Sequence, residues 1–349
     1  MIKLGFLGGG ADSIAGRVHL IASETDRKFK VIGGIFSKDK ERSKRSADIY
    51  NVKHFDSLEE MASEVDIIVI LTPTPLHHKN LKEVLKYDVG IIVDKPLLTS
   101  TKEAKDLDFK DKFVVVTHNY SGYPLVREIK ALYENKILGE IKKIKINMAQ
   151  ESFFKPLKEN YPQEWRKKDY SLPTIVLDLG VHTYHLAKFI VNKNFSPIFY
   201  EKNSFSSLGV IDDVITLAKG DDFLVELSFS KVSLGNTNPL FIEVYADKAG
   251  VKWTQDDFEN LYITYKDGKK EIINRSNAKF EASKKRYQRM APGHPSGFID
   301  AFANLYSDIY DAFIEFKQKK DFKNRFIYDY KHSLESLKFF EKGEECARD

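Results

Sequence analysis

Five short apolar runs within the first 120 residues constrain the fold of this chain more than any other feature of the sequence. Each run is almost continuous in Val, Ile and Leu, as parallel strands are when both of their faces are buried. Helical patterns lie between the runs; in Leu76–Tyr87, for example, apolar residues recur at helical spacing. Strands that alternate with helices in this way predict a doubly wound parallel sheet of the α/β class. The predicted strands are Ile2–Leu7, Lys30–Phe36, Asp66–Leu71, Val89–Val93 and Phe113–Thr117.

The pattern changes after about residue 120. A helical stretch, Leu125–Asn135, is followed by strand-like runs that have no regular helices between them. Half-buried strands of this kind predict an open, largely antiparallel sheet that is covered on one face. We therefore expect two domains, residues 1–120 and residues 121–349, with C-terminal helices from about residue 298 in the second domain. The strands of the second sheet are expected at Ile141–Met148, Ile215–Ala218, Phe223–Ser230, Phe241–Tyr245 and Leu261–Tyr265, and helix returns from Phe298 to about Phe340.

The composition limits the class of protein. A chain of 349 residues exceeds what one hydrophobic core usually serves, and 42% hydrophobic with 30% charged residues is typical of a globular protein. No apolar run approaches the ~18 residues of a membrane helix, and Cys346 is the only cysteine, which excludes an internal disulfide. Acidic residues are interspersed with basic ones, so the formal net charge of +4 creates no concentrated basic surface. We expect a cytoplasmic protein that binds neither nucleic acid nor membrane.

A glycine-rich turn follows the first predicted strand directly. Gly8, Gly9 and Gly10 precede an apolar helical pattern, and Ser13 stands where the dinucleotide fingerprint has its third glycine. Glycines at this point let the backbone turn tightly and approach a pyrophosphate, whose charge then lies at the helix N-terminus. The position between a strand and a helix favours a dinucleotide-binding loop over the alternative, a flexible glycine turn.

The residues after the second predicted strand bear on which dinucleotide binds. An acidic side chain there accepts hydrogen bonds from the ribose hydroxyls of NAD, whereas it repels the 2′-phosphate of NADP. This chain has Ser37, Lys38 and Arg42 in the region, and these side chains suit a phosphate. NADP is therefore slightly favoured over NAD. The neighbouring Asp39 keeps NAD open, and an ordinary surface role is the alternative for both cations.

Three further segments carry side chains suited to chemistry. Thr72-Pro73-Thr74-Pro75-Leu76-His77 and Asp94-Lys95-Pro96 close two predicted strands, at the sheet edge where open α/β proteins bind ligands. In Asp178-Leu179-Gly180-Val181-His182, a helix would place the aspartate and the histidine on one face, four residues apart. A histidine beside a carboxylate is a natural general base near neutral pH.

Taken together, these segments resemble the family of glucose–fructose oxidoreductase and inositol 2-dehydrogenase, the Gfo/Idh/MocA family. The family's Glu-Lys-Pro motif appears as Asp94-Lys95-Pro96, its Asp-x-Gly-x-His motif as Asp178 to His182, and a Trp-Arg pair of many members as Trp165-Arg166. Thr117–Pro124 and Gly293–Gly297 are similar to one uncharacterised branch of the family, and the resemblance extends from residue 2 to about residue 315. There are two departures. Aspartate at position 94 has a shorter reach than glutamate, and the glycines that usually precede the catalytic aspartate are missing from residues 172–177.

The resemblance implies an NAD(P)-binding Rossmann domain followed by a substrate-binding and oligomerisation domain. It implies an oxidoreductase that transfers a hydride between the nicotinamide and a secondary alcohol or ketone of a sugar, polyol or sugar derivative. In that reaction His182 moves the hydroxyl proton, Asp178 orients His182, and Lys95 binds the reacting oxygen. A homodimer or homotetramer, formed through the open face of the second sheet, is also implied. Cofactor contacts are expected from Gly8, Gly9, Gly10, Ser13, Ser37, Lys38, Arg42, Thr72, Pro73, His77, Asp94, Lys95, Pro96 and Arg166, and substrate contacts from Asn119, Tyr120, Tyr123, Trp165, His185 and His294.

Several alternatives stay open. Asp178, His182 and His185 also have metal-ligand spacing, but the sequence nearby offers no obvious fourth ligand, so no metal is expected. Lys95 and His182 have ordinary structural roles as alternatives, and aromatic residues are 13% of the chain, most of them necessarily core. Two other function classes compete: an NAD-dependent glycosidase with transient oxidation of its substrate, and a non-catalytic nucleotide-binding regulator. The acid–base set disfavours the regulator, which has no need of one.

Overall fold

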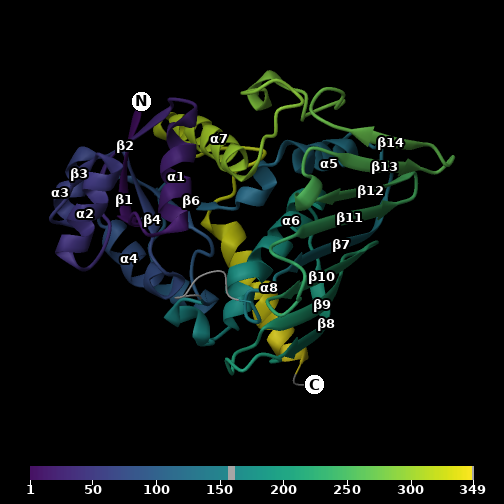
Figure 1. Cartoon of the computed structure of the whole chain (residues 1–349), viewed down its shortest axis with the longest axis horizontal. Coiled ribbons are helices and arrows are strands. Elements are labelled where there is room, and N and C mark those ends of the chain that lie inside the picture. The colour runs from purple at the N-terminus through teal and green to yellow at the C-terminus, as the bar shows by residue number, and fades with distance from the viewer. Residues whose placement is uncertain (156–161, 348–349) are drawn as a thin grey trace. The chain divides into compact units, whose positions relative to one another are not determined.

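The computed structural model describes residues 1–155 and 162–347. The chain divides into two compact units. Unit 1 consists of Met1–Gly122 and Phe298–Leu334, and unit 2 consists of Tyr123–Gly297 and the C-terminal segment from Glu335. Figure 1 labels helices and strands of both units. Among the described residues, no helix is both long and apolar enough to cross a membrane.

Unit 1 is built on a six-stranded sheet with the order β3-β2-β1-β4-β5-β6, in which all neighbouring strands are parallel. The order reverses between β1 and β4, and the carboxyl ends of strands at such a point form the ligand site of open α/β sheets. This sheet confirms the predicted doubly wound α/β class. The strands are β1 (Ile2–Gly8), β2 (Phe29–Ile35), β3 (Lys53–His54), β4 (Ile67–Leu71), β5 (Gly90–Asp94) and β6 (Val114–Thr117).

The helices of unit 1 are α1 (Ile14–Thr25), α2 (Lys40–Tyr50), α3 (Leu58–Glu64), α4 (His77–Val84) and α7 (Phe298–Lys319). Helix α7 lies beside α1 (Figure 1). Its apolar stripe, which includes Phe302 and Ile309, belongs to the same hydrophobic core as Leu4 and Val31 of the sheet. Residues 298–334 therefore lie in unit 1, although the sequence pattern placed them in the second domain. The reason is that apolar partners, rather than distance along the chain, decide where an amphipathic helix packs.

Unit 2 is built on an eight-stranded sheet with the order β14-β13-β12-β11-β7-β10-β9-β8, which can be followed from label to label in Figure 1. Only β7 and β10 are parallel neighbours; the other described pairs are antiparallel. The predicted open, largely antiparallel sheet is thus confirmed. The strands are β7 (Ile141–Ala149), β8 (Ser196–Asn203), β9 (Asp213–Lys219), β10 (Leu224–Ser230), β11 (Leu240–Ala246), β12 (Ala249–Thr254), β13 (Leu261–Tyr265) and β14 (Lys270–Ile273).

Helices α5 (Pro124–Glu134) and α6 (Val181–Val191) pack on one face of this sheet. Helix α8 (Tyr330–Cys346) begins in unit 1, and in unit 2 its Phe339 and Phe340 pack against other aromatic rings. The single helical region expected from Phe298 to about Phe340 is therefore two helices. Lys320, which follows α7, has a left-handed φ of 56°, and this conformation ends the helix there.

Candidate active site

The turn after β1 has a backbone that only glycine adopts easily. Gly8 and Gly9 have φ angles of +88° and +67°. A Cβ on Gly8 would lie 2.8 Å from the backbone nitrogen of Thr72, and a Cβ on Gly9 would lie 2.6 Å from Cδ1 of Leu71. The turn therefore depends on glycine at both positions. A tight turn of this kind, at the end of β1 and before α1, fits the pyrophosphate of a dinucleotide.

Ser13 and Gly16 have different roles at the start of α1, one as a helix cap and the other in close packing. Ser13 caps α1, because its Oγ accepts a hydrogen bond from the backbone N–H of Gly16 at 3.3 Å. Gly16 lies where the helix touches the turn, since a Cβ there would lie 1.9 Å from the carbonyl oxygen of Gly9. Close packing of helix against strand is the third glycine's role, and Gly16 fills it in this chain.

The region after β2 is rich in hydrogen bonds and ion pairs. Asp39 caps α2, accepting the backbone N–H of Arg42 at 2.7 Å, and its own N–H donates to Ser37 Oγ at 3.2 Å. Arg42 and Arg45 both pair with Asp12 of the glycine turn, at 3.2 and 3.4 Å. These three charged side chains are more than half exposed. Asp39, the acidic residue that left NAD as an alternative to NADP, therefore serves as the cap of α2.

His77 joins the loops that follow two strands. Its ring nitrogens lie 2.8 Å from the carbonyl oxygen of Thr72, after β4, and 2.8 Å from that of Pro96, after β5. Burial lowers the pKa of His77, although both carbonyls act in the opposite direction. Pro73 immediately precedes the short 3₁₀ turn, Thr74–Leu76, that leads into α4. His77 thus fixes the backbone on both sides of this sheet edge, and Lys95 immediately precedes one of its partners.

Asp94, at the end of β5, is held from three sides. Its Oδ1 accepts hydrogen bonds from the backbone N–H of Lys95 at 3.0 Å and the hydroxyl of Thr117 at 2.8 Å. Nε2 of the fully buried His19 lies 3.8 Å from the same oxygen, and its Nδ1 lies 2.7 Å from the hydroxyl of Tyr306. Burial acts to raise the pKa of Asp94, but His19, Lys95 and Thr117 outweigh it and hold that pKa well below its ordinary value. Asp94 is therefore an anion that fixes the backbone of Lys95.

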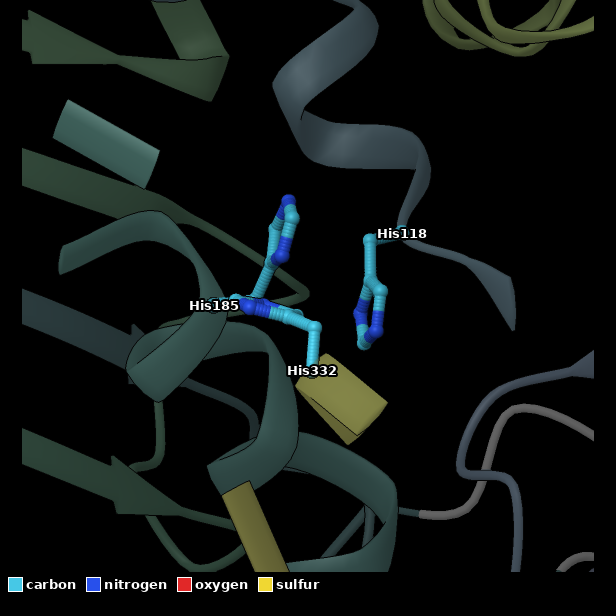
Figure 2. A group of neighbouring side chains, drawn as sticks. All are labelled: His118, His185 and His332. Carbon is cyan, nitrogen blue, oxygen red and sulfur yellow. The ribbon is translucent and has the colours of Figure 1, made fainter. Parts of the chain in front are cut away.

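His118 and Asn119, which follow β6, are both buried. The ring of His118 meets that of His332 edge to face, with centroids 5.5 Å apart (Figure 2). Burial lowers the pKa of His118 to about 3; the charge of Lys95 acts in the same direction and that of Asp94 in the opposite one. His118 is therefore neutral near pH 7.

In unit 2, Asp178 is bound by two cations that are distant from each other in the sequence. Lys231 Nζ lies 2.5 Å from Asp178 Oδ2, and Arg166 Nε lies 3.1 Å from the same oxygen. The side chain of Lys231 is fully buried, and that of Asp178 is 11% exposed. The guanidinium of Arg166 stacks on Trp165, 4.1 Å from the ring centroid. Arg166, expected at the cofactor, therefore has Asp178 as its ionic partner in this structure.

The segment that carries Asp178 is a π-helical turn, Val176–Gly180, and α6 begins at the next residue. Such turns are rare and occur frequently at functional sites. Asp178 and His182 are about one turn apart along this segment. His182 is 4% exposed, and His185, which Figure 2 also draws, is 1% exposed beside the ring of Phe189. The π-helical turn begins at Val176, at the end of the stretch 172–177 from which the family's usual glycines are missing.

The other residues expected at the substrate differ in exposure. Tyr123 packs against Trp253 and is 1% exposed, and Tyr120 is 5% exposed. Both positions fit a packing role, the alternative noted for the aromatic residues. His294 is exposed, and its carbonyl oxygen accepts a hydrogen bond at 2.6 Å from the buried guanidinium of Arg275. Its loop is therefore anchored while its side chain stays accessible.

Besides Gly16, sequence reasoning missed Lys231, Arg45 and His19. Lys231 has no motif around it and lies 53 residues from Asp178. Arg45 is one of several basic residues on a polar helix, so its position near Asp12 carries no distinct signal. His19 did have a signal: it is a histidine in the apolar stretch after the glycine turn, and such a residue needs a buried partner.

The fold and the glycine turn define a dinucleotide-binding protein of the doubly wound class. Residues 2–112 match the oxidoreductase family GFO_IDH_MocA, described by its NAD-binding Rossmann fold, and residues 126–252 match the GFO/IDH/MocA C-terminal domain. These matches span more than half of the chain, which therefore belongs to this family and is an NAD-binding oxidoreductase. The predicted family is confirmed.

Similar proteins extend over nearly the whole chain. "Uncharacterized oxidoreductase YfiI" of Bacillus subtilis is 23% identical, and the match covers 99% of this chain and 94% of that protein. An inositol dehydrogenase homolog from Azotobacter vinelandii, solved with NADH and myo-inositol, has a TM-score of 0.88 at 20% identity and covers 99% of this chain and 95% of its own. Levoglucosan dehydrogenase, solved with NADH and levoglucosan, has a TM-score of 0.80 at 15% identity, with coverage of 99% and 97%. At these identities the two solved structures establish the shared fold.

Proposed function

We propose that this protein is an NAD(P)-dependent dehydrogenase that acts on a secondary alcohol or ketone of a sugar, polyol or sugar derivative. The position of Lys95 carries the proposal. Lys95 directly follows β5, at the same edge of the parallel sheet as the glycine turn after β1. A cation at the edge that binds a dinucleotide is suited to hold the oxygen of an alcohol or ketone. The myo-inositol and levoglucosan named with two similar structures support this substrate class.

The roles of the residues follow from their chemistry. When bound, the nicotinamide supplies the hydride acceptor or donor. Lys95 hydrogen-bonds the reacting oxygen, and its charge stabilises the developing alkoxide. His182 takes the hydroxyl proton during oxidation and returns it during reduction, and Asp178 orients His182. Asp94, through its bond to the backbone of Lys95, keeps that residue in place.

The same proposal includes a preference for NADP over NAD. Ser37 and the exposed Lys38 follow β2, and Arg42 and Arg45 extend the cationic region along α2. A 2′-phosphate suits these groups, whereas Asp39, the acidic residue nearest the strand, is used as the cap of α2. The proposal is tested with Arg42→Gln and Arg45→Gln, which we expect to weaken NADP binding in calorimetry and leave NAD binding unchanged.

A homodimer or homotetramer in the cytoplasm is a further part of the proposal. Apolar side chains more than a third exposed lie on three neighbouring strands of the unit 2 sheet, and a groove of about 530 Å³ adjoins them. A second copy of the chain would cover this face. Leu217→Asp should therefore lower the mass measured by light scattering, and a monomeric wild-type protein would contradict the proposal. The apolar residues are Phe199, Ile215, Leu217 and Leu224.

Turnover tests the proposed reaction directly. Purified protein is incubated with NADP⁺ or NAD⁺ and a panel of sugars and polyols, and nicotinamide absorbance is followed at 340 nm. We expect turnover with at least one compound, with a loss of about 10²-fold or more in His182→Ala. Turnover that is equal in the wild type and in both His182→Ala and Lys95→Ala would contradict the assigned roles. Hydrolysis of an aryl glycoside without net change in absorbance would instead support the glycosidase alternative.

A further inference from the structure

Lys231 is a fully buried cation whose ionic partner is Asp178, the residue proposed to orient His182. It follows β10 directly, and its own backbone N–H donates to the carbonyl oxygen of Asp212 at 2.8 Å. The ring of Phe153 lies over the ammonium group, 5.1 Å from Nζ. These contacts hold the ammonium group of Lys231 beside the carboxylate of Asp178.

The carboxylate of Asp178 accepts hydrogen bonds from two cationic side chains. Its Oδ2 accepts from both Lys231 and Arg166, at 2.5 and 3.1 Å, and Arg166 Nη2 also lies 3.4 Å from Oδ1. Charge-assisted hydrogen bonds of this kind are stronger than neutral ones. Protonation of Asp178 would leave Lys231 as a buried cation without its anion, which is strongly unfavourable. Asp178 is therefore suited to remain ionised throughout a reaction.

We propose that Lys231 is a positioning residue, which fixes Asp178 as an anion so that Asp178 orients His182 without accepting its proton. This inference rests on the proposed function. The proton that His182 takes from the alcohol then stays on the imidazole until it leaves for solvent or returns to the product, and no proton passes through Asp178. The two cations also offset the negative charge of Asp178, which favours the neutral imidazole that a general base requires.

Two other aspartates of unit 2 accept hydrogen bonds from backbone N–H groups. Asp169 accepts backbone N–H groups of Thr174 and Ile211, at 2.8 and 2.9 Å. Asp212 accepts backbone N–H groups of the loop that follows β8, at 2.9 and 2.7 Å. Arg166 and Lys231 are thus ionic partners of Asp178, which lies on the segment that leads into α6 and His182, and His185 lies one turn further along α6.

The test follows the imidazole itself in the protein without added cofactor. Histidine signals are titrated by NMR, and the signal of His182 is identified by its loss in His182→Gln. We expect Lys231→Met to raise the pH midpoint of His182 by about one unit, because a nearby positive charge is removed. Lys231→Arg, which keeps the charge, should restore the midpoint. Lys266→Met, which removes an exposed lysine from the turn between β13 and β14, is the matched control and should change nothing.

A double variant shows whether Lys231 acts through Asp178. In an Asp178→Asn background Lys231 has lost the anion that keeps its buried ammonium group charged, so Lys231→Met should shift the midpoint of His182 by much less than in the wild type. It also removes both buried charges together, so it provides a folded protein if Lys231→Met alone unfolds. An equal shift in both backgrounds, or none in either, would overturn the inference.

Kinetics separates this inference from the proposed function. In Lys231→Met the acid limb of kcat/KM should move to higher pH by the same amount as the NMR midpoint, and Lys231→Arg should rescue it. If the wild type turns over substrate but Lys231→Met moves neither the acid limb nor the NMR midpoint, only the role of Lys231 is overturned. A shifted midpoint without turnover on any alcohol or ketone would instead overturn the proposed function, leaving the charge coupling between Lys231 and His182 intact.

Discussion

Two aspartates of the predicted motifs are held in very different ways. Asp94, in unit 1, accepts hydrogen bonds from the adjacent backbone N–H of Lys95 and the hydroxyl of Thr117, with His19 nearby. Asp178, in unit 2, is bound by two full cations, one of them completely buried. The first carboxylate organises backbone and hydroxyl groups. The second belongs to an ionic cluster in which removal of one charged group should destabilise the fold strongly.

The difference shows that a sequence motif identifies an aspartate but does not always identify its partners. The partners of Asp94 come from the next residue and from the end of the neighbouring parallel strand, so the fold places them automatically. The partners of Asp178 come from a short 3₁₀ turn and from the residue after β10. A motif identifies the aspartate in both cases, but only the structure shows the charge environment that determines what the aspartate can do.

The largest effect is expected from neutralising Asp178. Asp178→Asn leaves Lys231 buried without an anion, so we expect a loss of about 3–5 kcal/mol in the free energy of unfolding at pH 7. Urea denaturation measures it. Lys231→Met added to this variant should recover part of the loss, because the uncompensated charge is gone. A loss below about 1 kcal/mol would show that the cluster is not an ionic unit.

His118, unlike the two carboxylates, is neutral in the folded protein, and its effect on the free energy of unfolding depends on pH. Its folded pKa of about 3 lies below the ordinary value of 6.5, so below pH 6.5 the unfolded state binds more protons than the folded state. Above pH 6.5, His118 should therefore not lower the free energy of unfolding. As the pH falls from 6.5 towards 3, it should cost about 1 kcal/mol of unfolding free energy per pH unit. His118→Asn should remove this part of the acid sensitivity, whereas the exposed His294→Asn should retain it; equal slopes in both variants would contradict the assignment.

Asp94→Asn should have a smaller effect than Asp178→Asn, about 1–2 kcal/mol at pH 7, since Asp94 accepts its hydrogen bonds from a backbone N–H and a hydroxyl rather than from a fully buried lysine. The folded pKa of Asp94 is depressed, so its contribution is present above the unfolded value and is lost as the pH falls through the folded one. The difference between wild type and variant should therefore shrink below about pH 4. Denaturation at pH 7 and pH 3 checks this, and a difference that grows in acid would contradict it.

The smallest effect is expected at Asp12, whose pairs with Arg42 and Arg45 are exposed. Asp12→Asn should change the free energy of unfolding by less than about 1 kcal/mol. Because it frees both arginines for a 2′-phosphate, it should tighten NADP binding by about two- to fivefold more than NAD binding. Calorimetry measures both affinities. Equal changes for the two nucleotides would show that Asp12 does not act on the 2′-phosphate.

The sequence predicted the parts of this protein that depend on local pattern. The five buried strands, the glycine turn and the placement of Lys95 after a strand follow from periodicity and neighbouring residues. The sequence did not show that α7 packs on the parallel sheet, because one apolar stripe fits many surfaces. Gly16 was missed because its role depends on the approach of two backbones, and Lys231 because its partner lies 53 residues away. The roles proposed for Lys95, Asp178 and His182 stay predictions until turnover is measured.

Calorimetric titration with NAD, NADH, NADP and NADPH tests the central claim most directly. The wild type should bind at least one dinucleotide, with NADP(H) tighter than NAD(H), and Gly9→Val should abolish binding because its side chain would collide with Leu71. Gly209→Val is the matched control: Gly209 has a similar φ of +69° but nothing within 4 Å of a Cβ, so binding should persist. Absence of binding by the wild type, or unchanged binding by Gly9→Val, would contradict the account of the glycine turn and the function built on it.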